Sequence, residues 1–142
     1  MEELVSTDRG RNTEGRMPIS EDVALWKRRA ASFNQSAKRA GRTEKVTWQE
    51  IQAEFKMRQP MSEMCCWCYQ PLTVDTLSLD HLHALAKGGE HSLRNMAFSC
   101  RKCNRYKGSM TGEDYKNLLE ALRKVGLLTL FFRQYEPRRY RS

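Results

Sequence analysis

The chain has 142 residues, which is enough for one compact domain with short extensions but not for two independent cores. Only 39% of the residues are hydrophobic and 30% are charged, so the core is small and a bound metal would help it to fold. Lysine and arginine total 25 against 17 acidic residues, and the formal charge of +8 favours a polyanionic partner such as nucleic acid. The chain has no apolar run near the ~20 residues that span a bilayer and no apolar stretch of a secretory signal, so we expect a cytoplasmic protein without membrane contact.

Four regions are expected along the chain. Residues 1–18 have almost nothing apolar to bury and are predicted to be a disordered tail. Residues 19–60 form a basic helical region, residues 61–126 a domain that contains the cysteines, and residues 127–142 a basic C-terminal tail rich in arginine and tyrosine.

The first predicted element is a helix over residues 21–40. Ser20 before two acidic residues is typical of a helix start, and Gly41 of a helix end. The predicted buried face consists of Val23, Trp26, Ala30, Phe33 and Ala37. Basic residues eleven positions apart share a face beside it, and we expect them to bind phosphates, with a merely solvated face as the alternative. These predicted nucleic-acid contacts are Lys27, Arg28, Lys38 and Arg39, extended by Arg42.

A second helix and a hairpin follow. Thr47 and Glu50 match a capping box, and Pro60 ends the helical pattern near residue 58. Residues 76–83 alternate apolar and polar side chains like a half-buried strand, residues 96–99 resemble a second short strand, and a Lys-Gly-Gly turn lies between them.

The C-terminal third is predicted to be mainly helical. A short helix is expected from residue 101 to about residue 107. Thr111 caps another helix, whose apolar stripe begins at Tyr115 and ends at Gly126. The apolar run at 127–132 is consistent with a strand or a docked segment.

Five cysteines lie between residues 65 and 103, and in a reducing compartment such a group favours metal binding over disulfides. Cys65 with Cys68, and Cys100 with Cys103, form two C-x-x-C pairs, and a tight turn within each pair can aim both sulfurs at one point. Together they supply a tetrahedral four-sulfur site for a structural Zn²⁺ ion, and Cys66 is a bystander. Buried unligated thiols and a redox dithiol are the alternatives, and a redox site would usually show only one pair.

Between and after these pairs the chain carries polar residues in a characteristic order. They are Asp80-His81, a Gly-Gly turn, Asn95, and a C-x-x-C-N-x-x-K ending that includes Asn104 and Lys107. In this order they resemble the HNH endonuclease family over roughly residues 62–110. The resemblance implies an α+β fold, with a ββα-metal (HNH, treble-clef-like) core and zinc knuckle flanked by N-terminal and C-terminal helices. Residues 61–126 would then be the nuclease domain, similar to small free-standing HNH proteins of phages and bacteria.

The resemblance further implies a metal-dependent endonuclease that hydrolyses phosphodiester bonds in DNA. His81, as a neutral imidazole, is the expected general base. Mg²⁺ or Mn²⁺ takes oxygen ligands and keeps several waters, so Asp80 and Asn104 suffice as protein ligands of one catalytic ion. Asp80 faces away from His81 in a regular strand, so a twist at the strand end is needed to bring both to the phosphate. Asn95 is expected to brace the hairpin loop and orient His81 without binding metal.

Other polar residues are less constrained. Lys107 is expected to contact a DNA phosphate, with a solvent-facing position as the alternative. His83, two residues beyond His81 on the same strand face, could touch substrate or metal, and His91 is most simply a surface residue in a polar loop.

Two other functions stay open at this stage. A non-catalytic zinc-knuckle DNA-binding module would share the cysteines and the basic helix, but it leaves Asp80, His81 and Asn104 unexplained. An accessory nuclease, active only in a larger complex with phage or bacterial proteins, would keep the active site, as would an enzyme for RNA or branched DNA. Sequence specificity, single-strand or double-strand cleavage, and a role in packaging, homing or restriction are not decided by the sequence.

Overall fold

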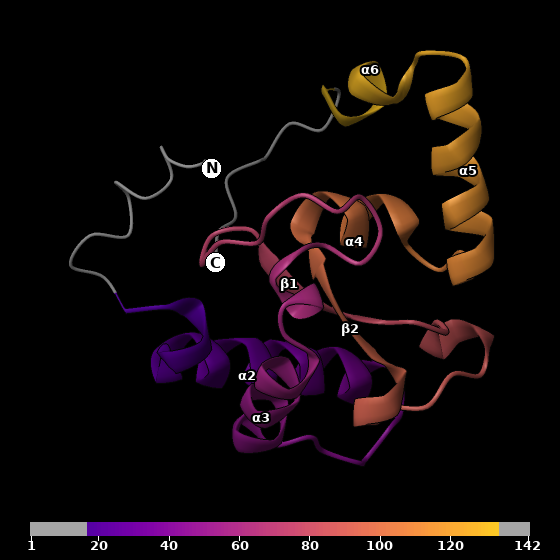
Figure 1. Cartoon of the computed structure of the whole chain (residues 1–142). Helices are drawn as coiled ribbons and strands as arrows, with labels where there is room; N and C mark the ends of the chain where they lie inside the picture. Colours follow the sequence, from indigo (N-terminus) through magenta and orange to yellow (C-terminus); the bar gives the residue numbers. More distant parts are fainter. Residues whose placement is uncertain (1–16, 134–142) are drawn as a thin grey trace.

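A computed structural model of the chain describes residues 17–133, so the predicted tails over 1–16 and 134–142 lie outside the described residues. Its helices and strands, in chain order, are α2 (Val23–Arg39), α3 (Trp48–Arg58), β1 (Leu77–His81), β2 (Met96–Cys100), α4 (Arg101–Lys107), α5 (Gly112–Lys124) and α6 (Leu128–Arg133). Figure 1 shows α2 and α3 on one side of the β1–β2 hairpin, with α4 on the other side and α5 beyond it. The predicted α+β fold, a ββα unit flanked by helices, is confirmed.

The two strands pair antiparallel, with Leu77 opposite Cys100 and His81 opposite Met96. β1 ends at His81, two residues earlier than predicted. The reason is local: the backbone N–H and C=O of His83 are bonded to the side chain of Asn95 instead of to a neighbouring strand. A side-chain amide thus ends the ladder and begins the loop.

Helix α2 begins at Val23 rather than at residue 21. Asp22 is its N-cap, since the side-chain oxygen of Asp22 accepts the N–H of Leu25 at 3.0 Å, and Ile19–Glu21 form a short 3-10 turn before it. This start places Leu25 in the core and leaves Val23 39% exposed, so the predicted buried face was wrong at Val23. The other four predicted face residues are buried.

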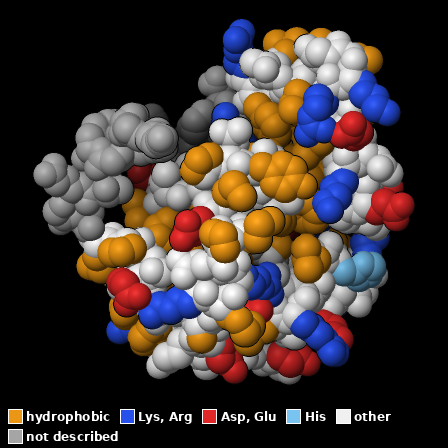
Figure 2. All heavy atoms as spheres, in the orientation of Figure 1, with side chains coloured by type: hydrophobic (Ala, Val, Ile, Leu, Met, Phe, Trp, Pro, Cys, Tyr) orange, Lys and Arg blue, Asp and Glu red, His pale blue; other side chains and the backbone are white. Residues whose placement is uncertain are grey.

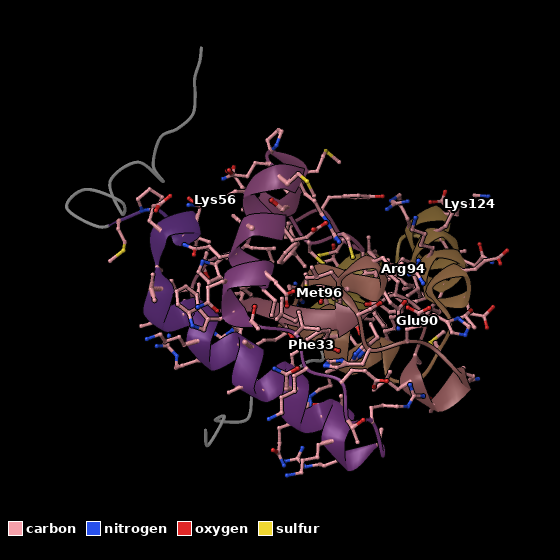
Figure 3. All side chains as sticks on the ribbon, turned by 90° about the horizontal axis from the view of Figure 1, so that it is seen from below. Phe33, Lys56, Glu90, Arg94, Met96 and Lys124 are labelled. Atoms are coloured by element: carbon pink, nitrogen blue, oxygen red, sulfur yellow. The ribbon has the colours of Figure 1, made fainter. Side chains whose placement is uncertain are left out.

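Helix α3 has the predicted capping box, in which Thr47 and Glu50 each bond the other's backbone N–H. It packs beside α2, and Figure 3 shows the two helices side by side with Phe33 turned inward. Trp26 of α2, Phe55 of α3 and Phe98 of β2 form the aromatic centre, with ring centroids 5.0 to 6.1 Å apart. This cluster anchors the hairpin to the helices, since aromatic pairs in this range attract one another.

The C-terminal part agrees with its prediction except that the last segment is not a strand. Thr111 caps α5 as expected, and Tyr115 and Leu119 are buried. Of the two predictions for the run at 127–132, the strand is wrong and the docked segment is confirmed. Leu128–Arg133 form the helix α6, in which the ring centre of Phe131 lies 4.5 Å from that of Tyr106 on α4. Part of the predicted tail is therefore helical and packed. Within residues 17–133 no helix has the length and apolar character needed to cross a membrane.

Candidate metal centre and active site

Four of the five cysteines meet beside the end of the hairpin. The sulfurs of Cys65, Cys68, Cys100 and Cys103 all lie within 4.8 Å of one another. Cys65 and Cys68 lie in a knuckle turn closed by the bond from the N–H of Tyr69 to the carbonyl of Cys65, and the other pair straddles the start of α4. Backbone N–H groups point at Cys65 Sγ and Cys100 Sγ, each at 3.4 Å, as they do toward thiolates. Four soft sulfur donors in one closed cluster fit a structural metal such as zinc.

Cys66 lies outside this cluster, as predicted. Its backbone N–H bonds the carbonyl of Phe98, and burial raises the pKa of its thiol to about 12. The thiol is therefore protonated near neutral pH, which is not the form that binds metal.

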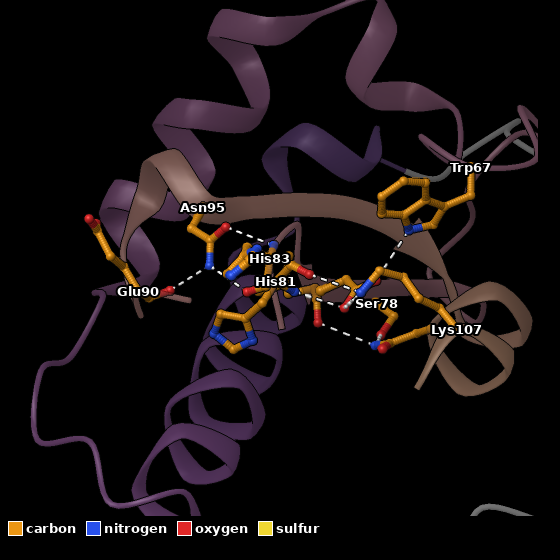
Figure 4. A network of polar contacts seen from close by, with 10 residues as sticks. Trp67, Ser78, His81, His83, Glu90, Asn95 and Lys107 are labelled. Atoms are coloured by element: carbon orange, nitrogen blue, oxygen red, sulfur yellow. Dashed lines mark hydrogen bonds and ion pairs between the residues drawn. The ribbon is translucent and has the colours of Figure 1, made fainter. Parts of the chain in front are cut away.

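Asn95 spans the loop between the strands, residues 82–95, which we call the site loop (Figure 4). Its amide oxygen accepts the N–H of His83 at 2.9 Å. Its amide nitrogen donates to the carbonyls of His83 and Glu90 at 3.0 and 2.6 Å. Three bonds from one side chain tie the two ends of the site loop together directly after His81, and both N–H donors of the amide are used within the loop. Asn95 thus braces the site loop.

Two arginines from the helical region hold the site loop from outside. Arg42 donates to the carbonyls of Gly89 and Leu85 at 2.7 and 3.0 Å, and Arg58 to those of Met96 and Leu93 at 2.9 and 3.1 Å. The guanidinium of Arg42 is therefore committed to the protein backbone. Its predicted role as a phosphate contact stays a prediction, although both terminal nitrogens of the half-buried guanidinium already bond the loop.

The imidazole of His81 lies on the face of β1 that meets α2. It is stacked on the ring of Phe33, with centroids 4.5 Å apart and planes at 19°. Its Nε2 lies 2.9 Å from Nδ1 of His91, and Nε2 of His91 lies 2.7 Å from Oδ1 of Asn34. Burial lowers the pKa of His81 to about 4, so its ring is neutral near neutral pH.

His91 is 4% exposed, so the expectation of a surface residue was wrong. Reading the sequence missed its link with Asn34, because the two residues are 57 positions apart and neither belongs to a motif. His83, in contrast, is exposed, and its Nε2 lies 3.0 Å from the carbonyl oxygen of Lys87.

The carboxylate of Asp80 lies on the opposite face of β1, toward α4. It accepts the indole N–H of Trp67 at 3.2 Å and lies 3.9 Å from Nζ of Lys107, and burial raises its pKa to about 6. Lys107 is 1% exposed, so the predicted phosphate contact and its solvent-facing alternative are both wrong for this residue. Its ammonium instead neutralises Asp80, because two opposite charges buried together cost less than either one alone.

The free edge of β1 is covered by side chains instead of by a third strand. Three donors from two helices bond alternate carbonyls along it, which satisfies the edge. They are Arg29 Nε to Leu77 (2.8 Å), Asn104 Nδ2 to Leu79 (3.3 Å) and Lys107 Nζ to His81 (3.2 Å). Asn104 also donates to Ser78 Oγ at 2.6 Å. Both bonds use the amide nitrogen of Asn104, so its amide oxygen is left for a ligand.

A small polar cleft of about 130 Å³ lies between α2 and α4 beside this edge. Among its lining residues are Arg29, Ser32, Ser36, Ser78, Arg101 and Asn104. Arg28 and Arg39 fall on the same helical stripe as Ser32 and Ser36, at spacings of four, eight and eleven residues. Lys27 and Lys38 lie on another stripe of the helix, and the ammonium of Lys27 lies 5.5 Å from the ring centre of Trp48.

The predicted site residues therefore fall into two groups. Asp80 and Asn104 both lie on the α4 side of β1, although each is bonded to its own partners and not to the other. His81 and its neighbours lie toward α2, and the backbone N–H of His81 bonds Asp80 Oδ1 at 2.8 Å. The strand alternation that sequence reasoning anticipated is present.

The order of these parts, a cysteine knuckle, a β-hairpin, a braced loop and a short helix carrying the second cysteine pair, defines a ββα unit with a metal knuckle. Residues 64–110, which contain all of these parts, match the family model of the HNH endonuclease. This segment, which is less than half of the chain, is thus similar to HNH endonuclease domains. A comparison with curated proteins gave no match.

Proposed function

We propose that this protein is a metal-dependent endonuclease that hydrolyses phosphodiester bonds in DNA. The observation that carries the proposal is the arrangement inside the family match: a half-buried, neutral histidine at the end of β1, a loop braced directly behind it by Asn95, and two oxygen donors, Asp80 and Asn104, on the α4 side of the strand. This combination suits hydrolysis better than binding alone, because a binding module needs no neutral base.

His81 acts as the general base and takes the proton from the attacking water, a role worth about 10²–10⁴-fold in rate. Phe33 stacks against its ring and keeps the imidazole plane in one orientation. Asn95 acts indirectly, by holding the backbone of His83 and thereby the end of β1.

One hard divalent cation, Mg²⁺ or Mn²⁺, would be held by Asp80 and Asn104. The donor types fit, since the amide oxygen of Asn104 has no partner within residues 17–133 and a carboxylate is a preferred ligand of such ions. Lys107 lies 3.9 Å from Asp80, which is too long for a hydrogen bond, so it balances the carboxylate charge without using its lone pairs. When bound, the ion would neutralise charge on the phosphate and on the departing oxygen.

DNA is proposed to lie along the polar cleft, where Arg28 and Arg39 of α2 would contact backbone phosphates. Ser32 and Ser36, on the same stripe, line the cleft together with Asn104, so this side of the helix faces the proposed metal ligands. Phosphate contacts of this kind position a duplex without reading its sequence, so low specificity is expected.

A second candidate is a DNA-binding module, or an accessory subunit that cuts only within a larger complex. The observation in its favour is that Asp80 is buried and already paired with Trp67 and Lys107. A partner or a conformational change would then be needed to open the metal site.

The test uses supercoiled plasmid and dialysed protein that keeps one equivalent of zinc. With Mg²⁺ or Mn²⁺ added back, wild type should nick the plasmid, and His81→Ala should lose about 10²-fold or more in rate. The matched control is His83→Gln, which changes an exposed histidine of the same segment and should keep most of the rate.

Plasmid that is bound but left intact with every cation tried would contradict the proposal and favour the second candidate. Equal loss in His81→Ala and His83→Gln would also contradict it, because a general effect on the segment, and not the base, would then explain the loss.

A further inference from the structure

A chain of hydrogen bonds runs from the backbone of Val46 to His81. Asn34 on α2 pairs with both backbone groups of Val46: its amide nitrogen donates to the carbonyl and its amide oxygen accepts the N–H, both at 2.9 Å. The same oxygen lies 2.7 Å from Nε2 of His91, and Nδ1 of His91 lies 2.9 Å from Nε2 of His81. Both imidazoles pack on Phe33, with ring centroids 4.5 and 4.7 Å from it.

The pairing of Asn34 with Val46 determines which atom is the donor in each of the other hydrogen bonds. The double pairing with Val46 fixes which amide atom of Asn34 is oxygen, because a reversed amide would set donor against donor and acceptor against acceptor. An amide oxygen can only accept, so Nε2 of His91 carries a proton. In a neutral ring Nδ1 of His91 is then the acceptor, and Nε2 of His81 must be the donor.

From this geometry we infer that His91 is a positioning residue, which holds His81 as the Nε2–H tautomer and leaves Nδ1 as the nitrogen that accepts the proton from water. The inference rests on the proposed function of His81 as general base. No hydrogen bond joins Nδ1 of His81 to any of residues 17–133, so this nitrogen is available. Burial of His91 also lowers its pKa, which favours a neutral ring. The hydrogen bonds from Val46 through Asn34 and His91 to His81, which we call the relay, require this neutral form.

The relay gives α2 and the following connection a part in the site. Asn34 and Val46 lie outside residues 64–110, the segment that matches the HNH family. Base orientation in this chain would thus depend on the N-terminal helical region and not on the family domain alone. This explains physically why a histidine in a polar loop is almost completely buried.

The direct test is the tautomer itself. Long-range ¹H–¹⁵N correlation spectra of the full-length chain, labelled with ¹⁵N at histidine, distinguish protonated from unprotonated ring nitrogens. The chain has three histidines, and His83→Gln assigns one set of signals. The expected result for wild type at neutral pH is a protonated Nε2 and an unprotonated Nδ1 for both His81 and His91. A His81 ring with its proton on Nδ1, or an even mixture, would overturn the inference.

Two substitutions of His91 then distinguish a positioning role from a role in folding alone. In His91→Gln the amide can donate to Asn34 and accept from His81, so the tautomer of His81 should be kept and the nicking rate should stay within a few-fold of wild type. In His91→Phe the ring still packs on Phe33 but neither bond forms, so His81 should become a tautomer mixture. The nicking rate should then fall by roughly 10-fold or more, since wrong-tautomer losses in catalytic histidines can be far larger.

The spectra and the nicking rates test the inference and the proposed function separately. If wild type shows the predicted tautomers but does not nick DNA, the proposed function is wrong and the hydrogen-bond relay stands. If wild type nicks DNA and His91→Phe, folded by its amide spectrum, nicks equally fast, the positioning role is wrong and the proposed function stands. If His91→Gln loses as much rate as His91→Phe, the relay is again contradicted, because its conservative replacement should rescue it.

Discussion

The turn of the site loop requires glycine at positions 88 and 89 for two different reasons. Gly88 has φ of +92°, a left-handed conformation that costs a residue with a side chain about 1–2 kcal/mol, but a Cβ there would meet open space. A Cβ on Gly89 would lie 1.9 Å from the carbonyl oxygen of His83. That overlap is with backbone, so it cannot be relieved by moving a flexible side chain.

The two glycines therefore predict different results for the same substitution. Gly89→Ala should lower the free energy of unfolding by about 3 kcal/mol or more, because the loop backbone must shift, whereas Gly88→Ala should cost about 1–2 kcal/mol. Denaturant unfolding of both variants measures this difference. Equal losses would mean that backbone strain, and not the close approach of His83, decides the choice of glycine in this turn.

At the scale of elements, the connection between α2 and α3 acts as a clamp on the site loop. Arg42 reaches from this connection to the carbonyls of Gly89 and Leu85. Lys45, three residues further along the same connection, is exposed and serves as the comparison. A hydrogen bond with one charged partner contributes about 1.5–3 kcal/mol when it is not solvated. The clamp therefore carries enough energy to govern the opening of the loop.

Arg42→Ala is expected to lower the free energy of unfolding by about 2 kcal/mol. In this variant the backbone amides of residues 85–91 should also exchange with solvent faster than they do in wild type. The amides of β1 and β2 should change less, because the loop opens before the sheet does. Hydrogen exchange of Arg42→Ala and of its control Lys45→Ala measures both effects. If the control loosens the loop as much, the effect comes from lost charge and not from the two carbonyl bonds.

Local signals explain which elements could be predicted from the sequence. The capping box of Thr47 and Glu50 and the cap at Thr111 act within one helical turn, so they determine their helix ends wherever the helix packs. The two C-x-x-C pairs similarly predict their own convergence, since each turn aims both of its sulfurs.

Other features depend on contacts between distant residues and could not be predicted in this way. The apolar run at 127–132 has no clear period, and its packing on Tyr106 of α4 decides for a helix. Arg42 and Lys107 were both assigned to DNA because a cation in a sequence carries no mark of its partner. The burial of His91 likewise depends on Asn34, 57 residues away.

For the whole molecule, the cysteine cluster joins the two ends of the segment that matches the HNH family. Cys65 and Cys68 precede the hairpin, Cys100 and Cys103 follow it, and a bound ion would close this loop. The hydrophobic content of 39% leaves little other stabilisation, so removal of the ion should affect the entire domain.

Purified protein should contain one equivalent of zinc, and a strong chelator should lower its melting temperature. A loss of about 5 kcal/mol, a conservative share of what structural zinc contributes, corresponds to a fall of roughly 10–20 °C for a chain of this size. Cys65→Ser should reproduce the loss without chelator, whereas Cys66→Ser should keep the metal. Metal analysis and thermal melts of the two variants provide the check, and zinc retained by Cys65→Ser at the wild-type level would remove this cysteine from the site.

The formal net charge of the chain is +8. On the face drawn in Figure 2, basic and acidic side chains alternate and hydrophobic ones gather near the centre, so this face offers no continuous basic area for a duplex. The arginines on the cleft side of α2 are the better candidates, since Arg28 and Arg39 are exposed and share a stripe with cleft residues.

This placement makes a prediction in which charge is held constant. Arg28→Gln with Arg39→Gln, and Lys27→Gln with Lys38→Gln, each remove two positive charges from α2, but from different stripes. Each lost phosphate contact should reduce the slope of log K against log salt by about 0.9, so the arginine pair should lower it by about 1.8 and the lysine pair by much less. Binding of a short duplex at several salt concentrations, with no divalent cation present, measures both slopes. Equal reductions would show that DNA responds to the total charge of the protein, and the duplex would then not lie along the cleft.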